Sequence, residues 1–193
     1  MSDVAFAIWA LMIVCFAALR YPAMRKARRQ RTAGDHRDVR DISLLVFCVL
    51  GLFVVPLFWW FSGVLALLDF EPSVVRVVLG TACALAFLWL FRRSHKDLGK
   101  NWSVSLEVRE GHQLVTDGVY KYVRHPMYVA FLLWGSAQWL LIANHVASII
   151  GLVSVLALFA GRHRREEAMM RATFGAAYDA YARNTKRLLP GVY

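Results

Sequence analysis

Five long apolar runs, separated by polar segments, constrain this 193-residue chain more than any other feature. Crossing the hydrocarbon core of a bilayer takes about 20 helical residues, so apolar runs of this kind indicate transmembrane helices. The runs are 4–19, 42–68, 74–91, 128–143 and 146–160. The chain is also 59% hydrophobic, which is more apolar than usual for a soluble domain of this size. We therefore expect an all-α integral membrane protein with about five transmembrane helices.

Basic residues fall almost entirely on alternate loops of this predicted bundle. Segment 20–41 contains eight Lys and Arg residues, segment 92–127 contains seven, and segment 161–193 contains seven. Of the 23 basic residues, 22 therefore lie on one side of the predicted membrane, and Arg76 is the exception. Because cytoplasmic loops carry an excess of Lys and Arg, this pattern predicts an N-terminus outside and the three basic segments in the cytoplasm.

The net charge of +10 is explained by these loops. A basic block such as 25–31 could bind nucleic acid in a soluble protein. Beside a membrane helix it is better interpreted as a topology signal that also contacts anionic lipid head groups, and we expect no nucleic-acid partner. The six histidines form no metal-ligand pair and the three cysteines lie in separate apolar runs, so no metal site is expected. The oligomeric state is left open.

The chain divides functionally near residue 92. We predict that residues 1–91 form a three-helix membrane scaffold. Residues 92–193 are predicted to form a cofactor-binding catalytic region that includes a transmembrane helical hairpin, 128–160. The second apolar run carries Pro56 near its middle, so it is either one tilted or kinked helix or a helix plus a re-entrant segment.

The polar part of the catalytic region is a long loop followed, after the hairpin, by a tail. Loop 92–127 is too long to be a mere connector and is predicted to be ordered. The tail from Arg162 to Asn184 has helical spacing, with a predicted break at Gly175. We expect this loop and the helical tail to form a pocket on the cytoplasmic side.

Two polar clusters lie where predicted helices leave the membrane on the basic side. In the first, His125 precedes Pro126, which suits the first turn of a helix, and a helix N-terminus attracts a carboxylate. The alternative is a basic interfacial anchor within an aromatic belt.

In the second polar cluster, Glu166 lies four residues after Arg162 and shares its helix face. Either Glu166 and Glu167 bind a cationic ligand or nearby arginines neutralise them; aromatic and carboxylate groups together suit a sulfonium or ammonium centre.

These segments resemble the isoprenylcysteine carboxyl methyltransferase family, integral membrane enzymes in a wider group with phospholipid N-methyltransferases. The resemblance covers roughly residues 98–190. It is carried, in order, by 98–103, 111–116, 118–120, 124–128, 166–167, 174–175 and 178–181. The sequence departs from the family pattern at Ala130, where the family has glycine, and at Ser105, where eukaryotic members have glutamine.

The resemblance implies S-adenosyl-L-methionine as the cofactor and a lipophilic substrate that enters from the membrane. It implies cofactor contacts at His112, Gln113, Leu114, Val115, Tyr120, His125, Pro126, Met127, Tyr128 and Glu166. Arg162 falls at the family's arginine near the substrate carboxylate, which favours carboxyl O-methylation of a prenylcysteine-like or other lipid-linked acid.

Three other functions remain open at this point. Methylation of a phospholipid or small amine would require a base, for which Glu167 and His163 are the candidates. A non-catalytic membrane protein that binds lipid or a partner is an alternative of another class. A nicotinamide-dependent reductase is a minor one.

Overall fold

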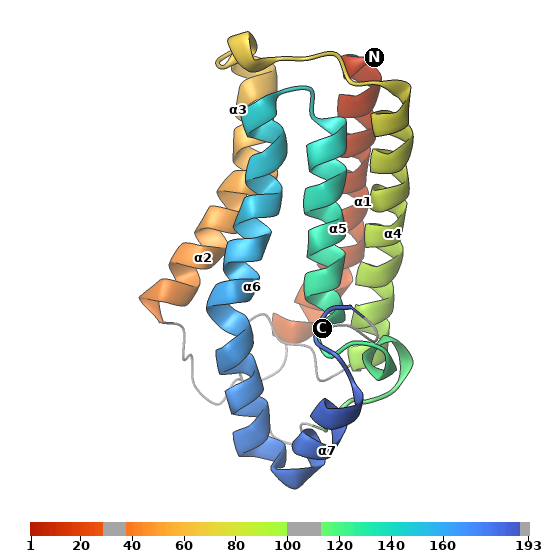
Figure 1. Cartoon of the computed structure of the whole chain (residues 1–193), viewed down its shortest axis with the longest axis vertical. Helices are drawn as coiled ribbons and strands as arrows, with labels where there is room; N and C mark the ends of the chain where they lie inside the picture. Colours follow the sequence, from red (N-terminus) through yellow and green to blue (C-terminus); the bar gives the residue numbers. More distant parts are fainter. Residues whose placement is uncertain (29–37, 100–112, 190–193) are drawn as a thin grey trace.

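The fold is a bundle of long helices with a small polar layer at one end (Figure 1). The computed structural model describes residues 1–28, 38–99 and 113–189. Within these ranges the regular elements are all helical, and pairing between extended segments is limited to two isolated bridges. The elements are α1 (Ser2–Arg28), α2 (Val39–Val49), η1 (Leu50–Val54), α3 (Val55–Ser62), η2 (Ala66–Leu68), α4 (Val74–Leu98), η4 (Gly118–Lys121), α5 (Pro126–Leu141), α6 (His145–Phe174) and α7 (Ala176–Asn184).

Four helices in the described part of the chain are long and apolar enough to cross a membrane. They span Ser2–Pro22, Val39–Ser62, Val74–Leu98 and His145–Phe174. The expectation of an all-α membrane protein is therefore confirmed. The fourth predicted span corresponds to α5, whose 16 residues make it shorter than these four. In Figure 1, α5 nevertheless runs alongside them, between α6 and α4.

The second apolar run forms one helix rather than a helix and a re-entrant piece. The helix Val39–Ser62 is continuous, but its middle five residues, Leu50–Val54, form a π-helical turn just before Pro56. Proline lacks the N–H that would continue the regular ladder, and a wider turn accommodates that loss. The helix ends at Gly63, which has a φ of 66°.

Gly51 in this π turn lies close to α6. A Cβ atom there would lie 2.8 Å from Ser154 Oγ and 2.9 Å from the Ile150 carbonyl oxygen. The fully buried Gln138 of α5 donates from Nε2 to the carbonyls of Gly51 and Ala147, both at 2.9 Å. A buried carbonyl without a hydrogen bond is costly in a membrane, so the bond from Gln138 to the Gly51 carbonyl is favourable. Through its two bonds Gln138 also links α5 to η1 and α6.

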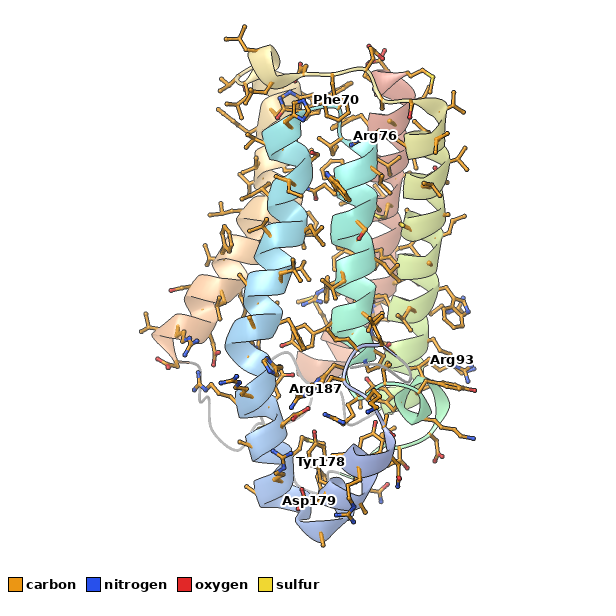
Figure 2. All side chains as sticks on the ribbon, in the orientation of Figure 1. Phe70, Arg76, Arg93, Tyr178, Asp179 and Arg187 are labelled. Atoms are coloured by element: carbon orange, nitrogen blue, oxygen red, sulfur yellow. The ribbon has the colours of Figure 1, made fainter. Side chains whose placement is uncertain are left out.

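The predicted hairpin of the last two apolar runs is confirmed. α5 ends at Leu141 and α6 begins at His145. Asn144 caps α6, since its Oδ1 accepts from the backbone N–H groups of Val146 and Ala147 at 3.1 and 3.0 Å. Its Nδ2 donates to Asp69 Oδ1 at 2.7 Å, which ties the hairpin to the segment between α3 and α4. This end of the bundle also carries Arg76 over the Phe70 ring (Figure 2).

At the other end, helices continue past the apolar runs that define them. α4 extends from the predicted limit at residue 91 to Leu98, with an i,i+4 ion pair between Arg93 and Asp97. α6 continues without interruption through the polar cluster to Phe174. The predicted break at Gly175 is confirmed, since this residue has a φ of 51° and α7 follows it. The polar layer of α7 and η4 therefore packs against the ends of α4, α5 and α6 (Figure 1).

Candidate functional site

A cavity of about 590 Å³ lies where the polar layer meets the bundle. Its polar part is lined by Gln113, Tyr120, Arg124, His125, Arg162, Glu166, Tyr178 and Tyr181. Its apolar part extends between the helices and is lined by Phe16, Leu45, Val49, Leu52, Phe53, Phe131 and Leu158, among others. A volume of this order accommodates a ligand of drug or cofactor size. One cavity thus offers a charged, aromatic environment and a hydrocarbon-like one.

The start of α5 forms one wall of the polar part. Pro126 is the first residue of the helix, as the sequence predicts, and His125 is its N-cap. His125, Pro126, Met127 and Tyr128 all line the cavity. The partial positive charge of the helix N-terminus therefore lies at the cavity wall, where it favours an anionic ligand group.

Glu166 of α6 lies in the adjoining part of the cavity wall and is connected to α5. Tyr128 Oη donates to Glu166 Oε1 at 2.7 Å, and His125 Nδ1 lies 3.6 Å from Glu166 Oε2. The Glu166 side chain keeps 20% exposure, so it is the accessible member of the acidic pair. A carboxylate placed among aromatic rings can attract a cationic group by charge pairing and by cation–π contact.

Arg162 lies one turn before Glu166 on the same wall. Its side chain is 9% exposed, and its Nε is 3.6 Å from Glu166 Oε1, beyond hydrogen-bond distance. Within the described residues, Nε is a buried donor with no hydrogen-bond partner. Because such a donor is costly, an anionic ligand group in the cavity would satisfy it.

The η4 segment is fixed to the end of α4 by Asp97, whose Oδ2 accepts from the Val119 N–H at 2.9 Å. Gly118 has a φ of 62°, and a Cβ atom there would overlap the Asp97 carboxylate. A left-handed backbone and a close approach, both of which favour glycine, therefore occur together at this position. The turn places Tyr120 in the cavity wall, buried to 8% exposure.

Tyrosines complete the polar wall as neutral groups. Tyr181 Oη donates to the Tyr120 carbonyl at 2.6 Å. Burial raises the pKa of Tyr120 above its usual value, with a further contribution from Tyr181. Burial likewise raises the pKa of Tyr181, with a further contribution from Tyr178. Tyr120 and Tyr181 therefore offer aromatic faces and O–H groups rather than a base.

Most of the site residues predicted from sequence converge on this cavity. Its described wall includes Gln113, Leu114, Val115, Tyr120, His125, Pro126, Met127, Tyr128, Arg162 and Glu166. His112 lies outside the described residues. Glu167 is not among the described residues that line the cavity. Its side chain is 3% exposed and faces Arg124 instead, with Glu167 Oε1 2.8 Å from Arg124 Nη2.

Comparison with known proteins identifies the family. The model of the isoprenylcysteine carboxyl methyltransferase family matches residues 74–172, about half of the chain. The chain belongs to this family. The match includes α4, α5 and most of α6, and it covers His125, Arg162 and Glu166.

Relatives and a solved structure agree with this membership. The chain is 31% identical over 138 residues to protein-S-isoprenylcysteine O-methyltransferase of Schizosaccharomyces pombe, covering 67% of this chain and 58% of the relative. It is 34% identical over 134 residues to protein-S-isoprenylcysteine O-methyltransferase B of Arabidopsis thaliana, covering 69% and 61%. The chain thus matches about three fifths of the length of these relatives.

A solved structure of the eukaryotic intramembrane Ras methyltransferase ICMT superposes with a TM-score of 0.55 at 22% identity. The superposition covers 83% of this chain and 55% of that chain. At this level of identity the likeness shows a shared fold.

Sequence reasoning missed one whole wall of the cavity in this family member. Leu45, Cys48, Val49, Leu52 and Phe53 line it from the helix that contains α2, η1 and α3. That helix is apolar on all sides, so its pattern does not separate a cavity wall from a lipid-facing surface. The cavity therefore draws on both the predicted scaffold, 1–91, and the predicted catalytic region.

Arg20 is a further cavity residue that the sequence analysis did not single out. It lies near the end of the apolar part of α1 and lines the cavity, with its guanidinium 5.6 Å from the Phe16 ring centre. In the sequence it is the first of many basic residues in a topology-determining segment. Its place in the wall becomes apparent only when α1 is packed against the other helices.

Proposed function

We propose that this protein is an S-adenosyl-L-methionine-dependent methyltransferase that methylates the carboxylate of a lipid-linked acid, such as a prenylcysteine. The observation that carries the proposal is the two-part cavity. A charged and aromatic part meets an apolar part between helices, and Arg162 lines the same wall as Glu166. Family membership and the names of the relatives support the same activity.

The polar part suits the proposed cofactor. Glu166 and the neighbouring tyrosines provide groups for a cationic centre, and the N-terminus of α5 with His125 provides groups for a carboxylate. S-adenosyl-L-methionine is a zwitterion, so its site needs groups for a cationic centre and groups for a carboxylate. When bound, S-adenosyl-L-methionine would supply a methyl group on a sulfonium sulfur, for transfer to a carboxylate oxygen with S-adenosylhomocysteine as the leaving group and with no proton transfer.

Arg162 is proposed to hold the acceptor carboxylate. A carboxylate of this type is ionised near neutral pH, so it needs orientation rather than a base. The buried guanidinium of Arg162, whose Nε makes no hydrogen bond to the described residues, can fix that orientation through charge-assisted hydrogen bonds. The protein would then accelerate transfer by aligning the reactants and excluding water.

The apolar part is proposed to hold the lipid of the acceptor. Its described lining comes from α1, α2, η1, α5 and α6, with Leu52, Phe53 and Phe131 among the side chains. Since this part lies between helices, a lipophilic substrate would reach it from the membrane. Burying each methylene would contribute about 0.8 kcal/mol, which makes a lipid chain an effective anchor.

An amine acceptor is less well supported. Its methylation would require a base in the cavity, and the two sequence candidates were Glu167 and His163. Neither is among the described residues that line the cavity. Glu167 is paired with arginines, and His163 Nδ1 lies 2.8 Å from the Phe159 carbonyl.

We further propose the membrane arrangement. α5 serves as a fifth span, the N-terminus lies outside, and the cavity faces the cytoplasm. The charge distribution supports this arrangement, since 22 of the 23 basic residues belong to the three segments that the sequence predicts to be cytoplasmic. Anionic lipid head groups are expected to contact these segments.

Two measurements on the detergent-purified full chain test the function. Calorimetry with S-adenosylhomocysteine should give one binding site per chain, and absence of binding at millimolar ligand would refute the proposal. Methyl transfer from labelled cofactor should then be compared for prenylcysteine analogues, amine lipids and membrane extract. Label in a base-labile ester on the prenylcysteine analogue is expected; label exclusively in amine lipids would contradict carboxyl methylation.

A further inference from the structure

Glu167 is the centre of a buried ion-pair network that joins three separate parts of the chain. Its Oε1 lies 2.8 Å from Arg124 Nη2 and 3.2 Å from Arg187 Nε. Its Oε2 lies 3.4 Å from Arg187 Nη2. The side chains of Glu167 and Arg124 are only 3% and 8% exposed, whereas Arg187 is 33% exposed. One carboxylate on α6 is therefore ion-paired with Arg124, just before α5, and with Arg187, after α7.

The segment after α7, residues 185–189, lies directly against the start of α5; we refer to it as the strap. The Arg124 N–H donates to the Lys186 carbonyl at 2.8 Å, and the His125 N–H donates to the Arg187 carbonyl at 3.1 Å. Val123 and Lys186 also form a parallel bridge. These are backbone contacts, so the strap fixes the course of the chain immediately before Pro126.

The Arg124 side chain also binds the backbone at the start of the strap. Its Nη1 donates to the Ala182 carbonyl at 3.0 Å and also to the Thr185 carbonyl. Thr185 itself is buried. Arg124 thus satisfies carbonyls at the C-terminal end of α7, which otherwise lack partners within the helix. Figure 2 shows Arg187 and Tyr178 at this end of the bundle, near the lower part of α6.

The same carboxylate also contacts His125, a residue of the cavity wall. His125 Nε2 lies 3.4 Å from Glu167 Oε1, while His125 Nδ1 lies 3.6 Å from Glu166 Oε2. The imidazole is therefore held between two successive glutamates of α6. The α7 residues Tyr178 and Tyr181, which line the cavity, are attached to the strap that Arg187 holds.

We propose that Glu167 is a positioning residue, which clamps the C-terminal strap onto the start of α5 and so fixes His125 and the α7 wall of the cavity. Both oxygens of Glu167 are engaged by cations, which leaves it unsuited to removing a proton. The effect on cofactor binding and turnover rests on the proposed function, but the clamp itself does not. Its partners Arg124 and Arg187 would act through the same contacts.

The clamp can be tested without any ligand by hydrogen–deuterium exchange of the full chain in detergent. In Glu167→Gln, the amides of Arg124 and His125 and the peptide 182–189 should exchange at least about tenfold faster than in the wild type. Peptides from the centre of the α5–α6 hairpin should be unchanged. Glu166→Gln is the matched control, because it makes the same change at the adjacent position without touching Arg124 or Arg187. It should leave the strap protected.

A second pair of variants covers the case in which Glu167→Gln does not fold. Arg187→Met removes the strap's side of the clamp at a partly exposed position and should also speed exchange at 124–125. Arg187→Lys retains the charge and should restore most of the protection. Unchanged exchange in both Glu167→Gln and Arg187→Met would overturn the proposal, as would equal loss of protection in Glu166→Gln.

The functional consequence is read separately. If the wild type binds S-adenosylhomocysteine, Arg187→Met should lower turnover on the order of 100-fold, as expected when reactive groups lose their alignment. Arg187→Lys should recover most of it. If the wild type binds no cofactor analogue, the proposed function fails, while faster exchange in the clamp variants would still support the clamp. Full turnover in Arg187→Met with an unprotected strap would contradict a positioning role.

Discussion

Tyr128 of α5 and Glu166 of α6 are joined in the cavity wall by a hydrogen bond of 2.7 Å from Tyr128 Oη to Glu166 Oε1. This bond connects the helix N-terminus that would receive a ligand carboxylate with the carboxylate that would receive its cationic group. Glu166→Ala should therefore weaken S-adenosylhomocysteine binding by at least about 100-fold, because the cationic group of the ligand loses the carboxylate that pairs with it. Calorimetry measures this directly.

Tyr128→Phe is a milder change at the same hydrogen bond. It keeps Glu166 but removes the donor that holds it, and hydrogen bonds to charged groups contribute about 1.5–3 kcal/mol. Binding should weaken by about tenfold or more, which is less than in Glu166→Ala. Wild-type affinity in Glu166→Ala would show that Glu166 does not contact the cofactor.

Arg162→Ala should separate acceptor handling from cofactor binding. Because Arg162 is proposed to hold the acceptor carboxylate, the variant should bind S-adenosylhomocysteine like the wild type. Its kcat/KM for the acceptor should fall about 100-fold. Arg165→Ala is the control on the same helix, since Arg165 pairs with Asp41 at 3.3 Å, is 43% exposed and lies off the described cavity wall. Full turnover in Arg162→Ala would exclude the acceptor role.

Phe53→Ala should change which lipid the cavity accepts. Phe16, Phe53 and Phe131 line the inner end of the cavity, with Phe16–Phe53 and Phe16–Phe131 ring centres 6.2 and 6.3 Å apart. Behind them Trp134 is fully buried, 4.9 Å from the Phe53 ring. These rings close the apolar part, and a phenyl ring is similar in size to one isoprene unit.

The expected result is a shift in kcat/KM toward acceptors one isoprene unit longer, measured with a series of prenylcysteine analogues. Phe58→Ala is the control, because Phe58 belongs to the same helix but is 56% exposed. Removing a fully buried ring costs about 3–5 kcal/mol of stability and the partly buried Phe53 ring should cost less, so thermal unfolding should be measured alongside. An unchanged chain-length profile in a folded Phe53→Ala would place the lipid elsewhere.

The helix pattern was predictable from the sequence because membrane spans have a strong signature. Apolar run length located α1, α4 and α6, and Asn144 marks the turn between α5 and α6. What run length could not give was where each helix ends. α4 and α6 continue into polar residues because their ends pack against η4 and α7 rather than ending at the membrane surface.

The site was predictable only where polar residues stand out from an apolar background. His125 and Glu166 do so, and the structure places them 3.6 Å apart, between Nδ1 and Oε2. Val49 and Leu52 do not, because every residue around them is apolar as well. The partners of Glu167 were also hidden, since Arg187 is twenty residues away in sequence and its contact depends on the turn at Gly175.

Gly118→Ala should disrupt the turn that places Tyr120 in the cavity. Two effects combine at this position: a left-handed φ of 62° and the overlap of a new Cβ with the Asp97 carboxylate. The backbone strain alone costs about 1–3 kcal/mol, and displacing Asp97 would also break its bond to the Val119 N–H.

Gly99→Ala is a matched control for the strain, because Gly99 has a φ of 55° but a Cβ there would meet no atom of the described residues within 4 Å. Thermal unfolding and S-adenosylhomocysteine affinity should be measured for both variants. Gly118→Ala is expected to lose more stability than Gly99→Ala and to bind the analogue more weakly. Equal losses in the two variants would mean that backbone strain, rather than the close approach of Asp97, explains the glycine at 118.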